Sequence, residues 1–174
     1  MAQSNTVNGH SEASNSTVRA SVLHGIKDLR IVSDFIRIYL DLFTHMTLLQ
    51  ERRSLPFPEP DHVQVAVQTT GLCGSDLHYF NHYRNGDIIV QEPLTLGHES
   101  AGVVCAVGSH VKDLDVGDKV ALEVGLPCME CELCQEGRYN ICKKLRFRSS
   151  AKSFPHFQGT LQERINHPAK MCYK

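Results

Sequence analysis

The alternation of apolar and polar side chains predicts several short β-strands along this chain. Residues 63–70 alternate with a period of two, as expected for a strand with one buried face. Two further short apolar stretches, 102–108 and 119–124, are separated by the turn-rich segment 113–118. Residues 21–31 alternate more loosely around a glycine and an aspartate, which predicts a hairpin. Short strands, frequent turns and few helices together predict a mainly β, barrel-like domain.

Helical periodicity in the strand-rich part of the chain is confined to one short segment. Residues 76–84 predict a helix that is capped by Ser75 or Asp76. His78 and His82 lie one helical turn apart there and could in principle bind a metal ion. No third ligand accompanies them, so two exposed histidines are the preferred interpretation.

The first residues differ in composition from the rest of the chain. Residues 1–17 are rich in Ser, Asn, Gln and Gly and contain few apolar side chains. Such a segment cannot bury enough surface to offset the entropy that is lost on ordering. We therefore expect a disordered tail over 1–17 and one folded domain over 18–174.

The overall charge is almost balanced. The chain of 174 residues has a formal net charge of −1, which indicates neither a nucleic acid nor an anionic membrane as a partner. It contains seven cysteines, an odd number, and no secretory signal is recognisable. This combination predicts metal sites plus spare thiols in a cytoplasmic protein. Cys105 and Cys172 are the spare thiols, and we expect both in the core.

Four of the cysteines form a compact motif. Three are spaced three residues apart and the fourth follows eight residues later: Cys128, Cys131, Cys134 and Cys142. This spacing suits one closed, tetrahedral zinc site that holds a surface lobe together. A pair of disulfides would need an oxidising compartment, and the spacings typical of iron–sulfur clusters differ. A structural zinc site is therefore the preferred of these three interpretations.

A second candidate metal site combines Cys73 with His98 and Glu99. A thiol, an imidazole and a carboxylate are zinc ligands, and a set with too few protein ligands leaves a position for water or substrate. In an extended segment Glu99 would point away from His98, so it would reach a metal only by local bending or through water. Alternatively, Cys73 is a small buried residue and His98 a core histidine. The presence of the four-cysteine motif favours the metal site.

Five motifs together resemble a known enzyme family. They are the segments Gly71–Tyr79 (GLCGSDLHY), Leu96–Val104 (LGHESAGVV), Val116–Glu123 (VGDKVALE), the four-cysteine motif and Gly159–Leu161 (GTL). In this order they resemble the N-terminal catalytic domain of the zinc-containing medium-chain dehydrogenases. Within that family they are most similar to the polyol branch, the sorbitol, xylitol and L-arabinitol dehydrogenases, particularly fungal ones.

The resemblance implies a fold and a chemistry. The fold is a GroES-like, partly open β-barrel with a small four-cysteine zinc lobe and few short helices. The activity is zinc-dependent, NAD-linked oxidation of a polyol secondary alcohol to a ketose. Cys73 and His98 would bind the catalytic zinc and Glu99 would be a ligand directly or through water. Ser75 would take the proton-relay position, and Tyr79 and Phe147 would line the polyol pocket. The full-length enzyme would be a homotetramer.

Residues 32–50 have no counterpart in that family. The segment is apolar, and Asp34, Arg37, Asp41 and Thr44 recur at helical spacing, which predicts a helix with a narrow polar stripe. Charges interrupt it too often for a membrane span. Two explanations stay open. It is either a natural helical insertion in a loop or a translated intron, since valine codons begin with the dinucleotide that opens introns and glutamine can be encoded by a triplet that closes them.

The resemblance also leaves a part of the family pattern unmatched. No Gly-x-Gly-x-x-Gly fingerprint follows a predicted strand, so we expect the dinucleotide-binding domain to be absent from this chain. Hydride transfer needs the cofactor held against the substrate. The alternative function is therefore a zinc-stabilised, non-catalytic β module or an inactive fragment of such an enzyme.

Overall fold

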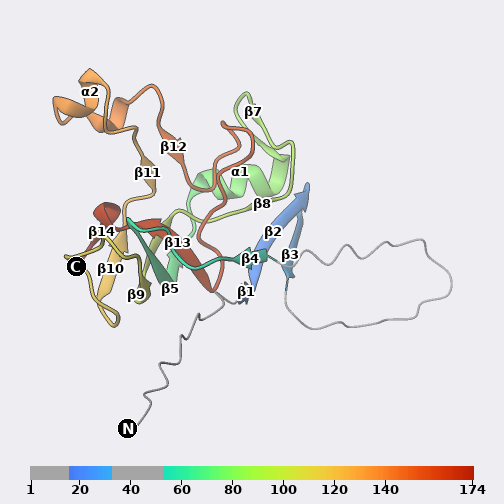
Figure 1. Ribbon diagram of the computed structural model, residues 1–174. Helices are drawn as coiled ribbons and strands as arrows, with labels where there is room; N and C mark the ends of the chain where they lie inside the picture. The colour runs from blue at the N-terminus through green and yellow to red at the C-terminus, as the bar shows by residue number, and fades with distance from the viewer. Residues whose placement is uncertain (1–15, 33–52) are drawn as a thin grey trace, which may run out of the picture.

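One five-stranded antiparallel sheet forms the centre of the computed structural model, which describes residues 16–32 and 53–174. Its strand order is β13-β5-β9-β10-β14 (Figure 1). The strands are β5 (His62–Gly71), β9 (Glu99–Val107), β10 (Lys119–Leu122), β13 (Arg164–Pro168) and β14 (Cys172–Tyr173). The strands predicted from alternation over 63–70, 102–108 and 119–124 are thereby confirmed.

The central sheet buries one apolar face. In β5, Val63 and Val65 are fully buried, and in β9 the facing Val104 is 1% exposed. These side chains belong to one core cluster with residues of neighbouring strands and loops: Leu114, Val120, Leu122, Val124, Ile165 and Cys172. The β-branched valines of the pattern therefore form the core against which the metal-bearing loops are held.

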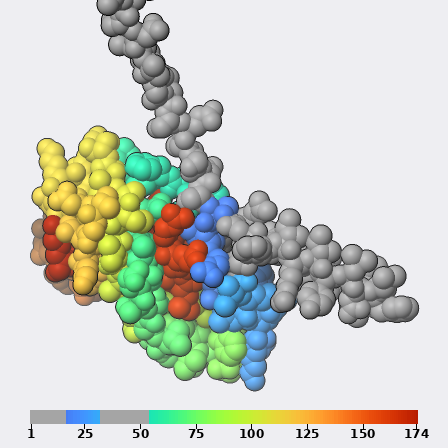
Figure 2. All heavy atoms as spheres, turned by 90° about the horizontal axis from the view of Figure 1, so that it is seen from below, coloured from blue at the N-terminus to red at the C-terminus, as the bar shows by residue number. Residues whose placement is uncertain are grey.

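A second, three-stranded sheet has the order β3-β2-β8. Its strands are β2 (Ala20–Gly25), β3 (Asp28–Val32) and β8 (Leu94–Thr95), so the hairpin predicted over 21–31 is confirmed. Figure 2 shows this blue hairpin segment beside the red C-terminal stretch, and Ser21 N donates to the Leu161 carbonyl at 2.8 Å. Helix α1 (Gly74–His82) covers a second core cluster. That cluster consists of Leu23, Tyr79, Val90, Leu94, Leu96 and Ala151.

The remaining described elements are short. They are β1 Ser16–Val18, β4 Arg53–Leu55, β6 Arg84–Asn85, β7 Ile88–Ile89, β11 Gly125–Leu126, β12 Arg146–Phe147, α2 Glu132–Gln135 and two 3-10 turns at Tyr139–Ile141 and Ala169–Met171. Within the described ranges the strands do not close into a barrel, which agrees with the partly open barrel expected. No helix in the described part of the chain is long and apolar enough to cross a membrane.

Three expectations from the sequence need correction. Ser16 and Thr17 do not belong to a disordered tail, because they form β1 and pair with Leu55 and Ser54 of β4. Cys105 is exposed rather than buried, since its neighbour Val104 takes the core side of β9.

Helix α1 differs from its prediction at both ends. It begins after Cys73, which is its N-cap in place of Ser75 or Asp76, and it ends at His82 instead of residue 84. The rest of the predicted tail, 1–15, and all of the 32–50 insertion except Val32 lie outside the described residues.

Gly102 is required by the close contact between β9 and β5. A Cβ at this position would collide with the carbonyl oxygen of Ala66 and with Val65. We expect Gly102→Ala to lower the free energy of unfolding by about 1–3 kcal/mol, because backbone must move to accept the methyl group. Urea denaturation measures this. Gly74→Ala is the matched control, since a Cβ there meets nothing within 4 Å. Equal stability of the two variants would contradict the packing argument.

A buried histidine links the stability of the sheet to pH. His167 of β13 is fully buried, donates from Nε2 to the Glu123 carbonyl at 2.9 Å, and accepts from Arg148 Nε at 3.1 Å. Burial, with the neighbouring Arg148 charge, lowers the pKa of His167 from 6.5 to about 3. The unfolded chain therefore binds more protons between these two pH values, so stability is complete above pH 6.5 and falls as the pH drops below it.

The expected loss is about 1.4 kcal/mol per pH unit between pH 6 and pH 4, attributable to this one residue. The urea midpoints of wild type and of His167→Gln are measured across this pH range. The difference between them gives the contribution of His167. If the stabilities of the two proteins fell in parallel as the pH drops, His167 would not be the cause of the loss.

Candidate functional site

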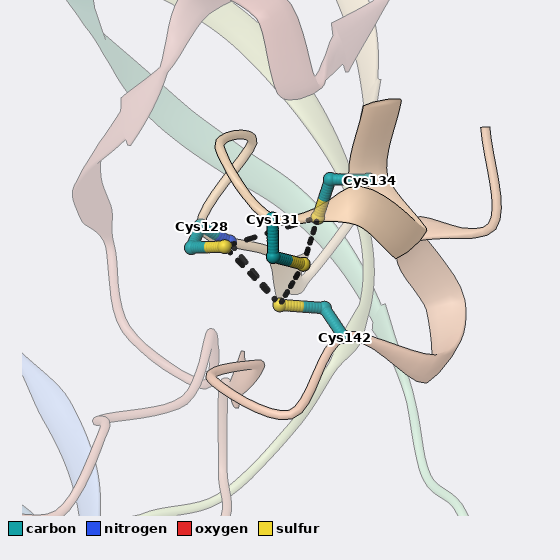
Figure 3. A group of neighbouring side chains, drawn as sticks. All are labelled: Cys128, Cys131, Cys134 and Cys142. Carbon is teal, nitrogen blue, oxygen red and sulfur yellow. Dashed lines mark hydrogen bonds between the residues drawn. The ribbon is translucent and has the colours of Figure 1, made fainter. Parts of the chain in front are cut away.

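The four-cysteine motif forms a lobe between β11 and β12. These two strands pair antiparallel and carry the loop at their ends, where α2 lies in orange (Figure 1). Cys131 is the N-cap of α2 and Cys134 lies within it, while Cys142 directly follows the 3-10 turn. All four thiols point toward one centre (Figure 3). The local turns thus bring the sequence motif together as predicted.

The distances between the sulfurs fit a single zinc ion. The Cys128–Cys142 and Cys131–Cys134 pairs are 3.5 Å apart, and the Cys131–Cys142 and Cys128–Cys134 pairs 3.9 and 4.0 Å. A tetrahedral site with Zn–S bonds of about 2.3 Å places its sulfurs about 3.8 Å apart. A disulfide needs about 2.05 Å, and all seven cysteines are free. Of the three interpretations, one tetrahedral ion fits best.

The electrostatics of the lobe also favour a bound cation. Hydrogen bonding from the Glu130 backbone lowers the pKa of the Cys128 thiol to about 6. Burial, with the neighbouring thiols, raises the pKa of Cys134 to about 12. Four adjacent thiolates repel one another, so they ionise together only when a cation such as Zn²⁺ lies between them.

The second candidate set gathers at the ends of β5 and β9. Cys73 follows β5 as the N-cap of α1, His98 directly precedes β9, and Glu99 is its first residue. The strand register pairs Gly71 with Glu99, which brings the two segments side by side. One ligand atom from each of Cys73, His98 and Glu99 lies within 4.8 Å of the others. His98 stands outside the strand, so the alternation that would separate it from Glu99 does not apply.

Asp76 supports this set from behind, a role that sequence reasoning missed. Its carboxylate is 2% exposed and accepts hydrogen bonds from Cys73 N at 3.1 Å, Gly97 N at 3.0 Å and Ser149 Oγ at 3.0 Å. Its Oδ1 also lies 3.5 Å from His98 Nδ1, which is buried without a hydrogen bond. A carboxylate behind the second ring nitrogen is how proteins orient a metal-binding histidine.

The position of Asp76 in the sequence gave a partial signal. It lies three residues after the N-cap, as the acidic residue of a capping box does. That pattern explains its contact with the Cys73 amide but not its contacts with Gly97 and Ser149, which are distant in the chain.

The charges around the second set are compatible with a bound cation. Asp76, with Cys73, raises the pKa of His98 to about 9. Hydrogen bonds from Ser75, then from His98, lower the pKa of the Cys73 thiol. The N-terminus of α1 favours the thiolate further. A cation bound here would replace the His98 proton and neutralise the thiolate.

The three residues predicted beside the substrate have different surroundings. Ser75 Oγ lies 3.4 Å from His98 Nε2, and the Phe147 ring meets the His98 ring edge-on at 5.5 Å between centroids. Phe147 is 39% exposed. Tyr79 instead lies in the second core cluster, 3% exposed, and its hydroxyl accepts from Ala151 N at 3.2 Å. The structure therefore brings Ser75 and Phe147 to the candidate site, and Tyr79 packs beneath the 149–151 segment.

The helical histidine pair lies on the exposed face of α1. His78 and His82 are exposed, with ring centroids 5.9 Å apart. In the ranges that the structure describes, the two cysteine-containing sets are the only groups of three or more potential ligands. The exposure of both side chains agrees with the preferred interpretation of the pair as exposed histidines.

Comparison with known proteins identifies the family. Residues 59–174 match the family described as alcohol dehydrogenase GroES-like domain. A sorbitol dehydrogenase of Arabidopsis thaliana is 45% identical over 120 residues, 69% of this chain and 32% of the relative. The D-xylulose reductase A of Aspergillus oryzae is 46% identical over 125 residues, 71% of this chain and 34% of the relative. The chain thus spans about a third of the length of these relatives.

Solved structures show the same relation. L-idonate 5-dehydrogenase from Escherichia coli superposes with a TM-score of 0.76 at 26% identity, over 93% of this chain and 40% of that one. A further Escherichia coli oxidoreductase/dehydrogenase gives a TM-score of 0.72 at 31% identity, over 91% of this chain and 40% of that one. With a family match over more than half of its residues, this chain belongs to the alcohol dehydrogenase GroES-like domain family.

Proposed function

We propose that this chain is the zinc-binding catalytic domain, residues 18–174, of an NAD-dependent polyol dehydrogenase. The reaction is oxidation of a secondary alcohol of sorbitol, xylitol or L-arabinitol to the ketose. The observation that carries the proposal is the open set of Cys73, His98 and Glu99, whose ligand atoms lie within 4.8 Å of one another. The relatives named as sorbitol dehydrogenase and D-xylulose reductase support a polyol as the substrate class.

Each residue of the set has a task in this proposal. Cys73, His98 and Glu99 would hold a zinc ion, which when bound supplies Lewis acidity that lowers the pKa of the substrate's hydroxyl group. Asp76 keeps the His98 ring oriented through Nδ1, leaving Nε2 for the metal. Ser75 Oγ, 3.4 Å from that Nε2, accepts the hydroxyl proton and passes it on toward solvent.

One aromatic residue would line the proposed pocket, and a second would support it from the core. Phe147 would form an exposed wall against the carbon chain of the polyol, since its ring stands edge-on to His98. Tyr79 would act from beneath, because its hydroxyl accepts from Ala151 N and thereby fixes the segment above it. The four-cysteine lobe would hold a second, structural zinc beside β12, the strand that carries Phe147.

The proposed oxidation also requires a hydride acceptor and a domain that binds it. The hydride acceptor would be NAD, bound by a dinucleotide domain of the kind that the longer relatives have room for. We also propose a homotetramer for the full-length enzyme. No nucleic acid or membrane partner is proposed, in keeping with the net charge of −1. A cytoplasmic location is supported by the seven free cysteines.

Polyol binding to the metal-loaded chain tests the proposal. The chain is loaded with Co²⁺, whose visible absorption reports on its ligands, and sorbitol, xylitol and L-arabinitol are added in turn. We expect at least one polyol to change the spectrum of wild type and of Cys105→Ala, and none to change that of Cys73→Ala. Cys105→Ala is the matched control because this exposed cysteine lies outside both sets.

NAD-dependent polyol oxidation is then measured on the longest protein encoded by the same transcript. Turnover that is lost in Ser75→Ala with metal content unchanged would support the proton-relay role. If both sets hold metal but no polyol alters the spectrum, the chain is a zinc-stabilised, non-catalytic module instead.

A further inference from the structure

Arg148 is buried between Phe147 and Ser149, beside strand β13 of the central sheet. Its residue surface is 6% exposed, and its guanidinium donates to three neutral acceptors. Nε donates to His167 Nδ1 at 3.1 Å, Nη1 to the Gln158 carbonyl at 3.1 Å and Nη2 to the Asn166 carbonyl at 2.6 Å. A guanidinium has five N–H groups, so two of them have no acceptor among residues 16–32 and 53–174.

This buried charge has no carboxylate partner among the described residues. Of the carboxylates on the adjoining segments, Glu163 is paired with Arg19, and Glu123 accepts from Gly125 N. Arg146 stacks on the same Phe157 ring as Arg148 and adds a second positive charge. Burial lowers the pKa of Arg148 to about 10, so it stays protonated at neutral pH. A buried cation with only neutral partners is costly unless an anion reaches it.

An open cavity of about 350 Å³ has Arg148 in its wall. Gln158 and Asn166, whose carbonyls accept from Nη1 and Nη2, both line the cavity together with Arg148. The rest of the wall is largely apolar, from Val18, Leu55, Pro56 and Ile165. None of the lining residues belongs to either metal set.

The amide side chains around the cavity are already engaged within the protein. Gln158 accepts from Thr95 N and donates to the Pro93 carbonyl. Asn166 accepts from Gln64 and donates to the Pro56 carbonyl. The free N–H groups of Arg148 are therefore the strongest donors left for a ligand, and they sit beside apolar walls.

We propose that this cavity binds a small organic monocarboxylate, with its carboxylate on the remaining N–H groups of Arg148 and its hydrocarbon body against Val18, Leu55 and Ile165. A guanidinium matches the geometry of a carboxylate, and charge-assisted bonds are strong where water is excluded. Apolar walls and a single cation suit a monocarboxylate better than a phosphate. The site stands independently of the proposed polyol oxidation.

Two acids and their uncharged amides test the proposal: benzoate with benzamide, and hexanoate with hexanamide. Binding to the full 174-residue chain is measured by titration calorimetry and by nuclear magnetic resonance of the ligand. We expect one or both acids to bind wild type at least about tenfold more tightly than the corresponding amide, since the amide lacks the charge. Equal binding of acid and amide, or no binding of either acid, would overturn the proposal.

Two variants localise the site. Arg148→Lys keeps the charge but loses the planar fork, and Ser54→Trp fills the cavity from the exposed strand β4 without touching the Arg148 hydrogen bonds. We expect each to weaken acid binding by at least about tenfold. Arg146→Gln, which removes the exposed cation on the same ring, is the control and retains binding. If Ser54→Trp folds and binds as wild type does, the acid binds elsewhere and the proposal fails.

Discussion

Replacing Cys131 by alanine is expected to release the metal of the four-cysteine lobe and to unfold residues 128–142 while the central sheet stays folded. Cys131 is both a sulfur ligand and the N-cap of α2, so its loss removes a ligand and the start of the helix. The lobe has little apolar core of its own. Within residues 128–142, Cys134 and Cys142 are the only buried residues. Structural zinc contributes about 10–16 kcal/mol to the folding of small zinc domains.

The measurement is limited proteolysis combined with metal analysis. We expect cleavage within 128–142 at least tenfold faster than in wild type, and a similar pattern when wild type is treated with a chelator. Cys105→Ala is the matched control, because this cysteine is exposed and belongs to neither set. Unchanged proteolysis of Cys131→Ala would mean that the lobe is held by its turns rather than by a metal.

Replacing Asp76 by asparagine is expected to weaken metal binding at Cys73, His98 and Glu99 by about 10–100-fold and to leave the lobe unaffected. Removal of such a carboxylate behind a metal-binding histidine typically has an effect of this size. The substitution keeps the shape of the side chain but removes its charge from His98 Nδ1, 3.5 Å away. It also replaces one of the two accepting oxygens by an NH2 group, which cannot accept from the backbone N–H of Cys73 or Gly97.

Competition with a chromogenic chelator measures the affinity of each set. Asp118→Asn is the matched control, because Asp118 also accepts a backbone N–H, from Asp115 at 2.8 Å, but lies outside both sets. Equal affinities of Asp76→Asn and Asp118→Asn for metal at Cys73, His98 and Glu99 would show that Asp76 only caps the helix.

Much of this architecture could be predicted because its signals are local. The strand over 63–70 and the hairpin over 21–31 follow from alternation, since each buries one face against a core. The four-cysteine lobe follows from spacing alone, because short turns suffice to bring its sulfurs together. The residues of the open set could be named from their chemistry and from the family resemblance.

What failed depended on contacts between distant segments. Thr17 joins a strand because Ser54 pairs with it, and nothing in the composition of 1–17 signals that partner. Cys105 was placed in the core by residue type, but the register of β9 gives the core position to Val104. Asp76 was assigned only a capping role, since its contact with Ser149 spans 73 positions in the chain.

We propose that this chain holds two separate metal sites, one closed and one open. Zinc content of the purified chain, measured for wild type, Cys73→Ala and Cys131→Ala, tests it most directly. We expect two zinc ions per wild-type chain and one in each variant, because each set supplies its own ligands. A single zinc that is lost only with Cys131→Ala would contradict it, since Cys73, His98 and Glu99 would then lie close together without binding metal.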